Sequence, residues 1–154
     1  MSNKADHMDA NEKQLISEFF AVASKLNDTG IVRSDKLLGD IGEWLCVKTY
    51  GLVLAESGRN TGFDGCIGDN KTQVKVHNAP IGTNISVGNP DKYDELIILI
   101  GPRSRLRNTD NKLSFHVYRF SSNEVRETMK QTSGFYCAKG TLEDKQYDAI
   151  SLEA

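Results

Sequence analysis

The chain has few cysteines, and their spacing fits neither a disulfide framework nor a zinc site. Cys46, Cys66 and Cys137 are odd in number, lie far apart and form no Cys-x-x-Cys or Cys/His pattern. We therefore expect a reduced protein of the cytoplasm.

Long apolar runs and an excess of positive charge are also missing. No stretch approaches the roughly 18 consecutive apolar residues that span a bilayer, and residues 1–9 lack the charged-then-apolar pattern of a secretion signal. The 19 Lys and Arg residues are balanced by 21 Asp and Glu. We therefore expect no membrane partner, and we expect any nucleic-acid binding to depend on a local cluster of positive charge.

The length of 154 residues and a hydrophobic share of 38% suit one domain with one core. Residues 1–9 are polar, and we expect a disordered tail there. We expect the single domain to cover residues 10–154.

Helical periodicity dominates the first third of the chain. Apolar residues at helical spacing predict an amphipathic helix over residues 11–26. A second helix is predicted from an N-cap at Ser34, with Asp35 in its first turn, to a stop at Gly51. Period-two alternation then predicts short strands over residues 52–55, 62–68 and 72–78.

The second half of the chain predicts further strands and one more helix. Residues 79–92 carry turn signals at both ends, and we expect a long loop. The apolar run 96–100 predicts a strand buried on both faces, and 113–120 alternates as another. Ser121 and Glu124 have the spacing of a capping box that opens a short helix to about Gln131, whereas the part from Gly134 onward is ambiguous. These elements predict a mixed α/β domain.

A tight hairpin is predicted where residues 62–68 and 72–78 meet. With Asp69 and Asn70 as the central turn residues, Asp64 lies across from Lys75, and Cys66 lies across from Gln73. Since strand side chains alternate, one face then collects the polar side chains. That face holds Asp64, Cys66, Gln73, Lys75 and His77.

This polar face has the donors that a hard divalent cation requires. Asp64, Gln73 and the carbonyl of Val74 offer oxygen ligands for Mg²⁺, and Lys75 could stabilise charge on a phosphate or orient a water molecule. A solvated hairpin with an Asp64–Lys75 ion pair explains the same pattern, and Cys66 also fits a small buried apolar residue.

Glu43 is the candidate acid on the second helix. Gly39 and Gly42 lie beside it, and glycines inside a helix are costly enough to suggest close approach of the helix backbone to the sheet. Such an approach would bring Glu43 to the polar face of the hairpin. An exposed Glu43 paired with Lys48 or Lys36 is the alternative.

The order of these motifs resembles the restriction-endonuclease-like PD-(D/E)XK superfamily. The match runs from Glu43 through Gly62-Phe63-Asp64-Gly65 to Gln73-Val74-Lys75, covers about residues 39–78, and the order of elements agrees to about residue 120. Gln73 stands at the (D/E) position, which is similar to the QXK form of Mrr-like nucleases. The motifs are also similar to those of small bacterial members of that superfamily.

The resemblance implies a three-layer fold with a central mixed β-sheet flanked by helices. It also implies an endonuclease that hydrolyses DNA, with RNA not excluded, in restriction or defence and as a homodimer. Its Mg²⁺ (or Mn²⁺) would be bound by Asp64, Glu43, Gln73 and Val74, with Lys75 beside the water. Because Gln73 is neutral, a non-catalytic nucleic-acid-binding or assembly module with the same fold remains an alternative.

Arginines near the ends of the predicted strands are the candidates for phosphate contact, because guanidinium groups bind phosphates in bidentate geometry. Arg103, Arg105 and Arg107 follow the buried strand, and Arg59 precedes the hairpin. His77 is a further candidate at the rim. An ordinary soluble turn would account equally for the three arginines of the loop.

Overall fold

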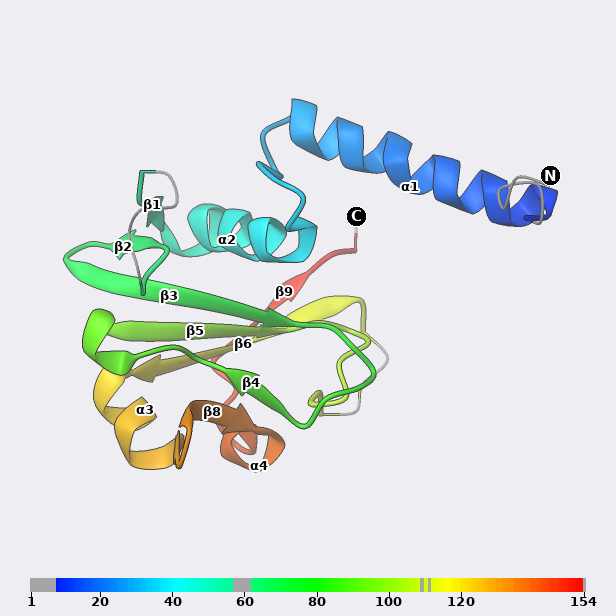
Figure 1. Ribbon diagram of the computed structural model, residues 1–154. Coiled ribbons are helices and arrows are strands. Elements are labelled where there is room, and N and C mark those ends of the chain that lie inside the picture. Colours follow the sequence, from blue (N-terminus) through cyan, green and yellow to red (C-terminus); the bar gives the residue numbers. More distant parts are fainter. Residues whose placement is uncertain (1–7, 57–61, 109, 111, 154) are drawn as a thin grey trace.

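The computed structural model describes residues 8–56, 62–108, 110 and 112–153 (Figure 1). The elements in chain order are α1 (Ala10–Asp28), α2 (Leu37–Tyr50), β1 (Val53–Leu54), β2 (Gly65–Ile67), β3 (Asn70–His77), β4 (Asn84–Ser86), the 3₁₀ turn η2 (Pro90–Lys92), β5 (Glu95–Ile100), β6 (Ser114–Ser121), α3 (Ser122–Thr128), β7 (Lys130–Gln131), β8 (Gly134–Ala138), α4 (Lys139–Leu142) and β9 (Asp148–Ser151).

A six-stranded mixed sheet forms the centre of the molecule, in the order β1-β2-β3-β5-β6-β9. Strands β3 and β5 run parallel, and every other neighbouring pair in this sheet is antiparallel. The apolar run Leu96 to Ile100 lies in β5 and is fully buried. The predicted strand with two covered faces is therefore confirmed.

Different layers cover the two faces of this sheet (Figure 1). Helix α2 packs on one face, through a core that includes Leu45 and Val74. On the other face lie α3, α4 and a small sheet in the order β4-β8-β7, around a core that includes Ile98 and Tyr118. The protein is thus a mixed α/β structure with a central mixed sheet flanked by helices, as the sequence predicted.

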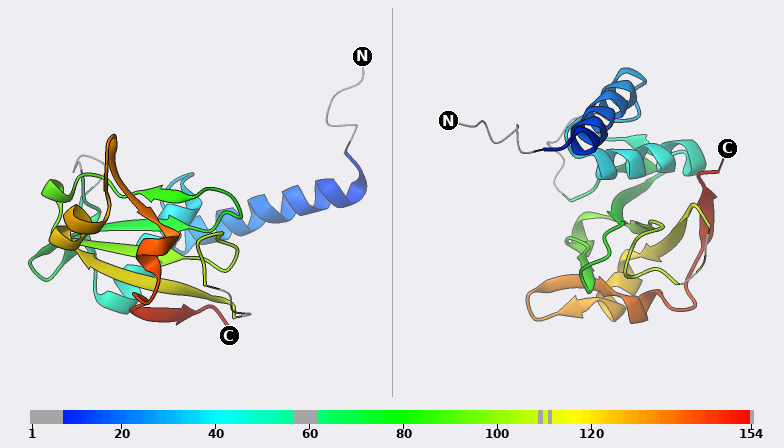
Figure 2. Two further views of the ribbon diagram at one scale, coloured as in Figure 1. Left: turned by 90° about the horizontal axis from the view of Figure 1, so that it is seen from below. Right: turned by 90° about the vertical axis from the view of Figure 1, so that its right-hand side faces the viewer.

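Helix α1 extends away from the sheet, with no other element along most of its length (Figure 2). Asp9 caps it through a reciprocal capping box with Glu12. The helix predicted over 11–26 is confirmed, while the expected disordered tail lies mostly outside the described residues. None of the described helices combines the length and apolar character that crossing a bilayer requires.

Helix α2 begins later than predicted. Its N-cap position is Lys36 rather than Ser34, and no side chain caps it. The Ser34 hydroxyl instead donates to the Asp40 carboxylate at 2.9 Å and accepts from the Lys36 N–H at 3.1 Å. The predicted end is correct, because Gly51 terminates α2 in the left-handed conformation with φ +73°.

The hairpin register differs from the predicted one by two residues. Ile67 pairs with Asn70 and Cys66 with Lys71, so the turn residues are Gly68 and Asp69. Gly68 adopts φ +58°, which glycine tolerates without strain, and this allows the turn to form one residue earlier. A shift by two keeps the paired strand residues on their predicted faces. Asp64 precedes β2 and lies level with Gln73 instead of Lys75, and its carboxylate turns to the backbone of Val74, so the predicted common face with Gln73 and Lys75 is not formed.

Two regions predicted as loop or ambiguous contain strands. The segment 79–92 includes β4 and the turn η2, and the part after Gly134 includes β8, α4 and β9. Strand β4 pairs with β8, about fifty residues later in the chain. Strands β4 and β9 are short and pair with strands that are distant in the sequence, so neither has a strong local signal.

Candidate active site

Strand β3 has an open edge in its second half. Its pairing with β2 ends at Thr72, whereas its pairing with β5 continues to His77. Asp64 lies where β2 and β3 separate: its N–H donates to the Thr72 carbonyl at 2.9 Å, and its carboxylate accepts the Val74 N–H at 2.7 Å. The chain thereby holds a carboxylate against the open edge of β3.

Val74 presents its backbone to this edge and its side chain to the core. Its N–H points to Asp64, and the N–H and C=O of one residue in an extended strand point to the same side. The Val74 carbonyl therefore faces the open edge. The side chain is only 8% exposed and packs in the core beneath α2.

The predicted close approach of α2 to the sheet occurs at Gly42 and not at Gly39. A Cβ atom on Gly42 would lie 2.2 Å from Cγ2 of Val76, whereas one on Gly39 would meet nothing within 4 Å. Because Glu43 follows Gly42 directly, this contact brings Glu43 down to the level of the sheet, and its side chain is only 17% exposed.

Glu43 and Asp64 form an adjacent carboxyl pair. Burial, the negative charge of Asp64 and the hydrogen bond that protonated Glu43 makes to it raise the pKa of Glu43 to about 7. The structure thus brings together the two acids that the sequence singled out. They come from α2 and from the start of the hairpin, and they meet at the open edge of β3.

Arg33 is a residue of this site that sequence reasoning missed. Its Nη2 atom donates to Oε2 of Glu43 at 2.9 Å, and its backbone N–H donates to the Asp40 carboxylate at 2.8 Å. The ion pair lowers the pKa of Glu43, against the larger effects that raise it. Neither Lys48 nor Lys36 makes this ion pair. Arg33 lies in the loop between α1 and α2, and its position depends on a chain reversal with no local sequence signal.

Gln73 and Lys75 project from the other side of the same edge. Through the parallel pairing they lie level with Leu96 and Ile98, which pack in the core opposite α2. Gln73 is half-buried, and its amide lies near Gly88. Lys75 is half-buried and belongs to none of the ion pairs within the described part of the chain, so the Asp64–Lys75 pair considered above is not formed there.

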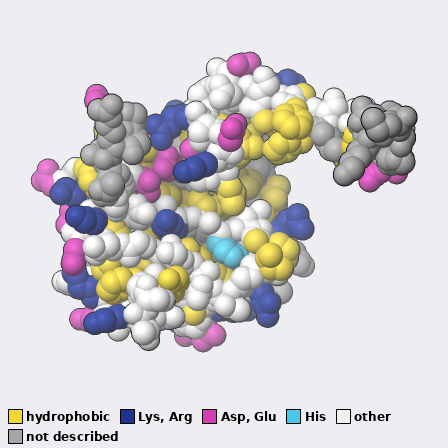
Figure 3. All heavy atoms as spheres, viewed as in Figure 1, with side chains coloured by type: hydrophobic (Ala, Val, Ile, Leu, Met, Phe, Trp, Pro, Cys, Tyr) yellow, Lys and Arg dark blue, Asp and Glu magenta, His cyan; other side chains and the backbone are white. Residues whose placement is uncertain are grey.

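His77 and an arginine-bearing loop continue this surface. The Nδ1 atom of His77 lies 2.6 Å from the Ser104 hydroxyl, which fixes the loop after β5 against the end of β3. Figure 3 shows acidic and basic side chains together beside α2, and a histidine on the same face.

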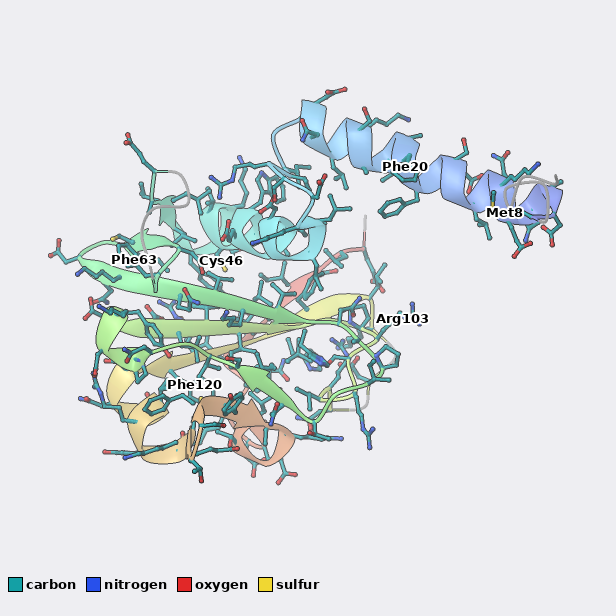
Figure 4. All side chains as sticks on the ribbon, viewed as in Figure 1. Met8, Phe20, Cys46, Phe63, Arg103 and Phe120 are labelled. Atoms are coloured by element: carbon teal, nitrogen blue, oxygen red, sulfur yellow. The ribbon has the colours of Figure 1, made fainter. Side chains whose placement is uncertain are left out.

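The three arginines of that loop have different environments. Arg103 and Arg105 are exposed, and Figure 4 shows Arg103 near the end of β3. Arg107 is 6% exposed, and its guanidinium donates to backbone carbonyls, to Ser114 and to Asp110. The expected phosphate contact therefore does not suit Arg107, which holds the loop together. Arg59 lies outside the described residues.

The donor set at the edge suits a hard divalent cation. Two half-buried carboxylates repel one another when both are ionised, and this repulsion adds to burial in raising the pKa of Glu43. A cation between them relieves it, with the Val74 carbonyl as a neutral donor that faces the same edge. Among the described residues, no three His, Cys, Asp or Glu side chains are grouped as a metal site, so the charged part of the site is this one pair.

No protein-family model matches the chain, and no curated protein is significantly similar to it.

Proposed function

We propose that this protein is a Mg²⁺- or Mn²⁺-dependent nuclease that hydrolyses phosphodiester bonds of DNA, with a restriction-endonuclease-like fold of the QXK type. The observation that carries the proposal is the contact between Glu43 and Asp64 at the open edge of β3. The motif order that resembles the PD-(D/E)XK superfamily supports it. A role in restriction or defence follows from that resemblance alone.

The proposed chemistry divides the residues around the edge between metal binding and stabilisation of the phosphate. Asp64, Glu43, Gln73 and the Val74 carbonyl would hold the metal, which would polarise the phosphate and lower the pKa of a bound water. Lys75 would place its ammonium beside the reacting phosphate and stabilise the negative charge that develops there. Because Lys75 is half-buried, fewer water molecules compete with the phosphate for its ammonium group.

Binding of the nucleic acid would extend along β3 to its end. A strand rises about 3.3 Å per residue, so Val74 and His77 are separated by about 10 Å. This distance is comparable to the spacing of one or two phosphates along a DNA strand. His77, Arg103 and Arg105 would thus contact phosphates beside the one that is cleaved.

The direct test measures cleavage of plasmid and linear DNA by the full chain with Mg²⁺, Mn²⁺ or EDTA. We expect cleavage with either metal, and we expect Lys75→Ala, Asp64→Asn and Glu43→Gln each to reduce it at least about a hundredfold. Asp64→Asn retains an acceptor for the Val74 N–H, so the local fold is preserved while the charge is lost. Cleavage that survives all three substitutions would refute the proposal.

A matched lysine provides the control. Lys71 lies on the same face of β3, is exposed, and stacks over the ring of Phe63 with Nζ 5.6 Å from the centroid. Lys71→Ala removes the same charge from the same strand, outside the carboxylate pair. It should leave cleavage within about twofold of the unmodified protein.

A second candidate function is a non-catalytic module that binds nucleic acid or assembles with a partner. The Arg33–Glu43 ion pair favours it, because a fixed cation already compensates one of the two carboxylates. This function predicts DNA binding without cleavage, and no rise in melting temperature with Mg²⁺. Gln73→Glu separates the two: a third carboxylate should increase Mg²⁺-dependent stabilisation only where the edge already binds the metal.

A further inference from the structure

Helix α1 has an apolar stripe that the described part of the chain leaves largely uncovered. Leu15, Phe19 and Val22 are 56%, 53% and 54% exposed. Figure 4 shows Phe20, at 66% exposure, on a stretch of α1 that stands clear of the other elements. Amphipathic helices obtain most of their stability from packing of the apolar face, so this stripe requires a partner surface.

The spacing of the stripe is that of a seam between two helices. Leu15, Phe19, Val22 and Leu26 follow one another at intervals of four, three and four residues, the pattern of core positions in a coiled coil. Leu26 is half-buried near the end of the helix, while the other three are open. The covering element is therefore expected to be another helix.

We propose that α1 of a second copy of this chain covers the stripe, in antiparallel orientation. With the two helices centred between residues 20 and 21, Leu15 packs against the partner's Leu26, and Phe19 packs against the partner's Val22. Each large aromatic ring then meets a smaller branched side chain, which fills the seam evenly. The stripe is thus complementary to itself, as a twofold interface requires.

The charges that flank the stripe select the antiparallel orientation. Glu18 and Lys25 each immediately precede a core residue, so both lie on the same flank of the stripe. Antiparallel pairing places Glu18 beside the partner's Lys25, and the symmetric pair forms at the other end. Parallel pairing would place them beside the uncharged positions 23 and 30 of the other copy. Only one orientation therefore gains two ion pairs.

Sedimentation velocity of the full chain, over about 1 to 200 µM at low salt, tests the dimer. We expect a concentration-dependent dimer, and we expect Phe19→Asp to leave the chain monomeric at every concentration. Ser17→Asp, which adds the same charge to an exposed position off the stripe, is the matched control and should dimerise as the unmodified chain does. Phe19 is exposed, so melting of the sheet domain should be unchanged by either substitution.

Charge exchange tests the orientation. Glu18→Lys should weaken the dimer about tenfold, and Lys25→Glu should have a similar effect, because each converts two attractive pairs to repulsive ones. The chain with both substitutions should regain the original affinity. A monomer at all concentrations, with α1 either free or packed against its own domain, would overturn the proposal. So would a dimer that tolerates Phe19→Asp, or a double exchange that fails to restore affinity.

Discussion

The guanidinium of Arg33 contacts the carboxylate of Glu43 at 2.9 Å, on the side chain that also faces Asp64. Arg33 is about half exposed, whereas Glu43 is largely covered. A half-exposed cationic side chain thus reaches a largely covered carboxylate pair. Under the proposed function, Arg33 and a divalent cation compete for Glu43.

Arg33→Ala should therefore strengthen metal binding while slightly destabilising the metal-free protein. Loss of a half-exposed ion pair should lower the free energy of unfolding by about 0.5 kcal/mol. Removal of the nearby positive charge should lower the dissociation constant for Mg²⁺ about fivefold at pH 8, where Glu43 is ionised. Isothermal titration with Mg²⁺ checks this, with Arg105→Ala as the control. Weaker Mg²⁺ binding by Arg33→Ala would mean that Arg33 supports the site instead.

The raised pKa of Glu43 predicts that the metal-free protein loses stability as the pH rises. Folding increases the pKa of this carboxyl from 4.5 to about 7, so the folded state holds a proton that the unfolded state releases between these values. The stabilising contribution is complete below pH 4.5 and is lost as the pH passes through 7.

Urea unfolding in EDTA, from pH 5 to 8, measures this dependence. Glu43→Gln removes the titrating group and should show a flatter decrease in the free energy of unfolding than the unmodified chain. Saturating Mg²⁺ should also reduce the decrease at high pH. Identical pH profiles for the two proteins in EDTA would show that titration of Glu43 does not cause the loss of stability.

The sequence indicated that Glu43 could meet Asp64, with an exposed Glu43 as the alternative, and the resemblance favoured the meeting. Helical periodicity and the glycine beside Glu43 indicated close packing of α2, and alternation identified the polar face of the hairpin. The turn could form at several neighbouring Gly, Asp and Asn residues, so the register was ambiguous by small shifts. The contact of Arg33 with Glu43 depends on how the chain reverses direction between α1 and α2. No local pattern in the sequence indicates it.

Contacts between residues distant in the sequence explain the other differences between the predicted and the observed structure. Strand β4 is three residues long, and its hydrogen bonds come from β8. Alternation over three residues is too short to distinguish a strand from a loop. Similarly, Arg107 differs from Arg103 and Arg105 only through burial of its side chain, which depends on the path of residues 108–114 around it.

Two glycines in α2 provide a paired test of the packing that positions Glu43. Gly42→Ala places a methyl group 2.2 Å from Cγ2 of Val76, a stiff branched side chain, and should destabilise the protein by about 2 kcal/mol. Gly39→Ala meets open space and should stabilise it by about 0.5 kcal/mol through helix propensity. Chemical denaturation measures both. Equal effects of the two substitutions would contradict the close approach of α2 to β3 at Gly42.

Substitutions in the loop after β5 should change DNA binding and protein stability independently of one another. Arg103 and Arg105 are exposed, and their backbone N–H groups, which bond to Asn78 and Ala79, remain when the side chains are shortened. Replacing both with Ala should weaken DNA binding and lower the slope of log affinity against log salt by about 2, with little change in melting temperature.

Arg107→Ala should have the opposite pattern. Its guanidinium is buried and bonds to the carbonyls of Ile100 and Ser114, so its loss removes a donor from these two acceptors and one of the donors to Asp110. We expect the free energy of unfolding to fall by about 3 kcal/mol, with the salt slope of the remaining folded protein unchanged. Fluorescence anisotropy across a salt series, alongside thermal melting, measures both quantities. A lower salt slope in Arg107→Ala than in the double variant would show that phosphate contact comes from the buried arginine, and that the loop opens to bind DNA.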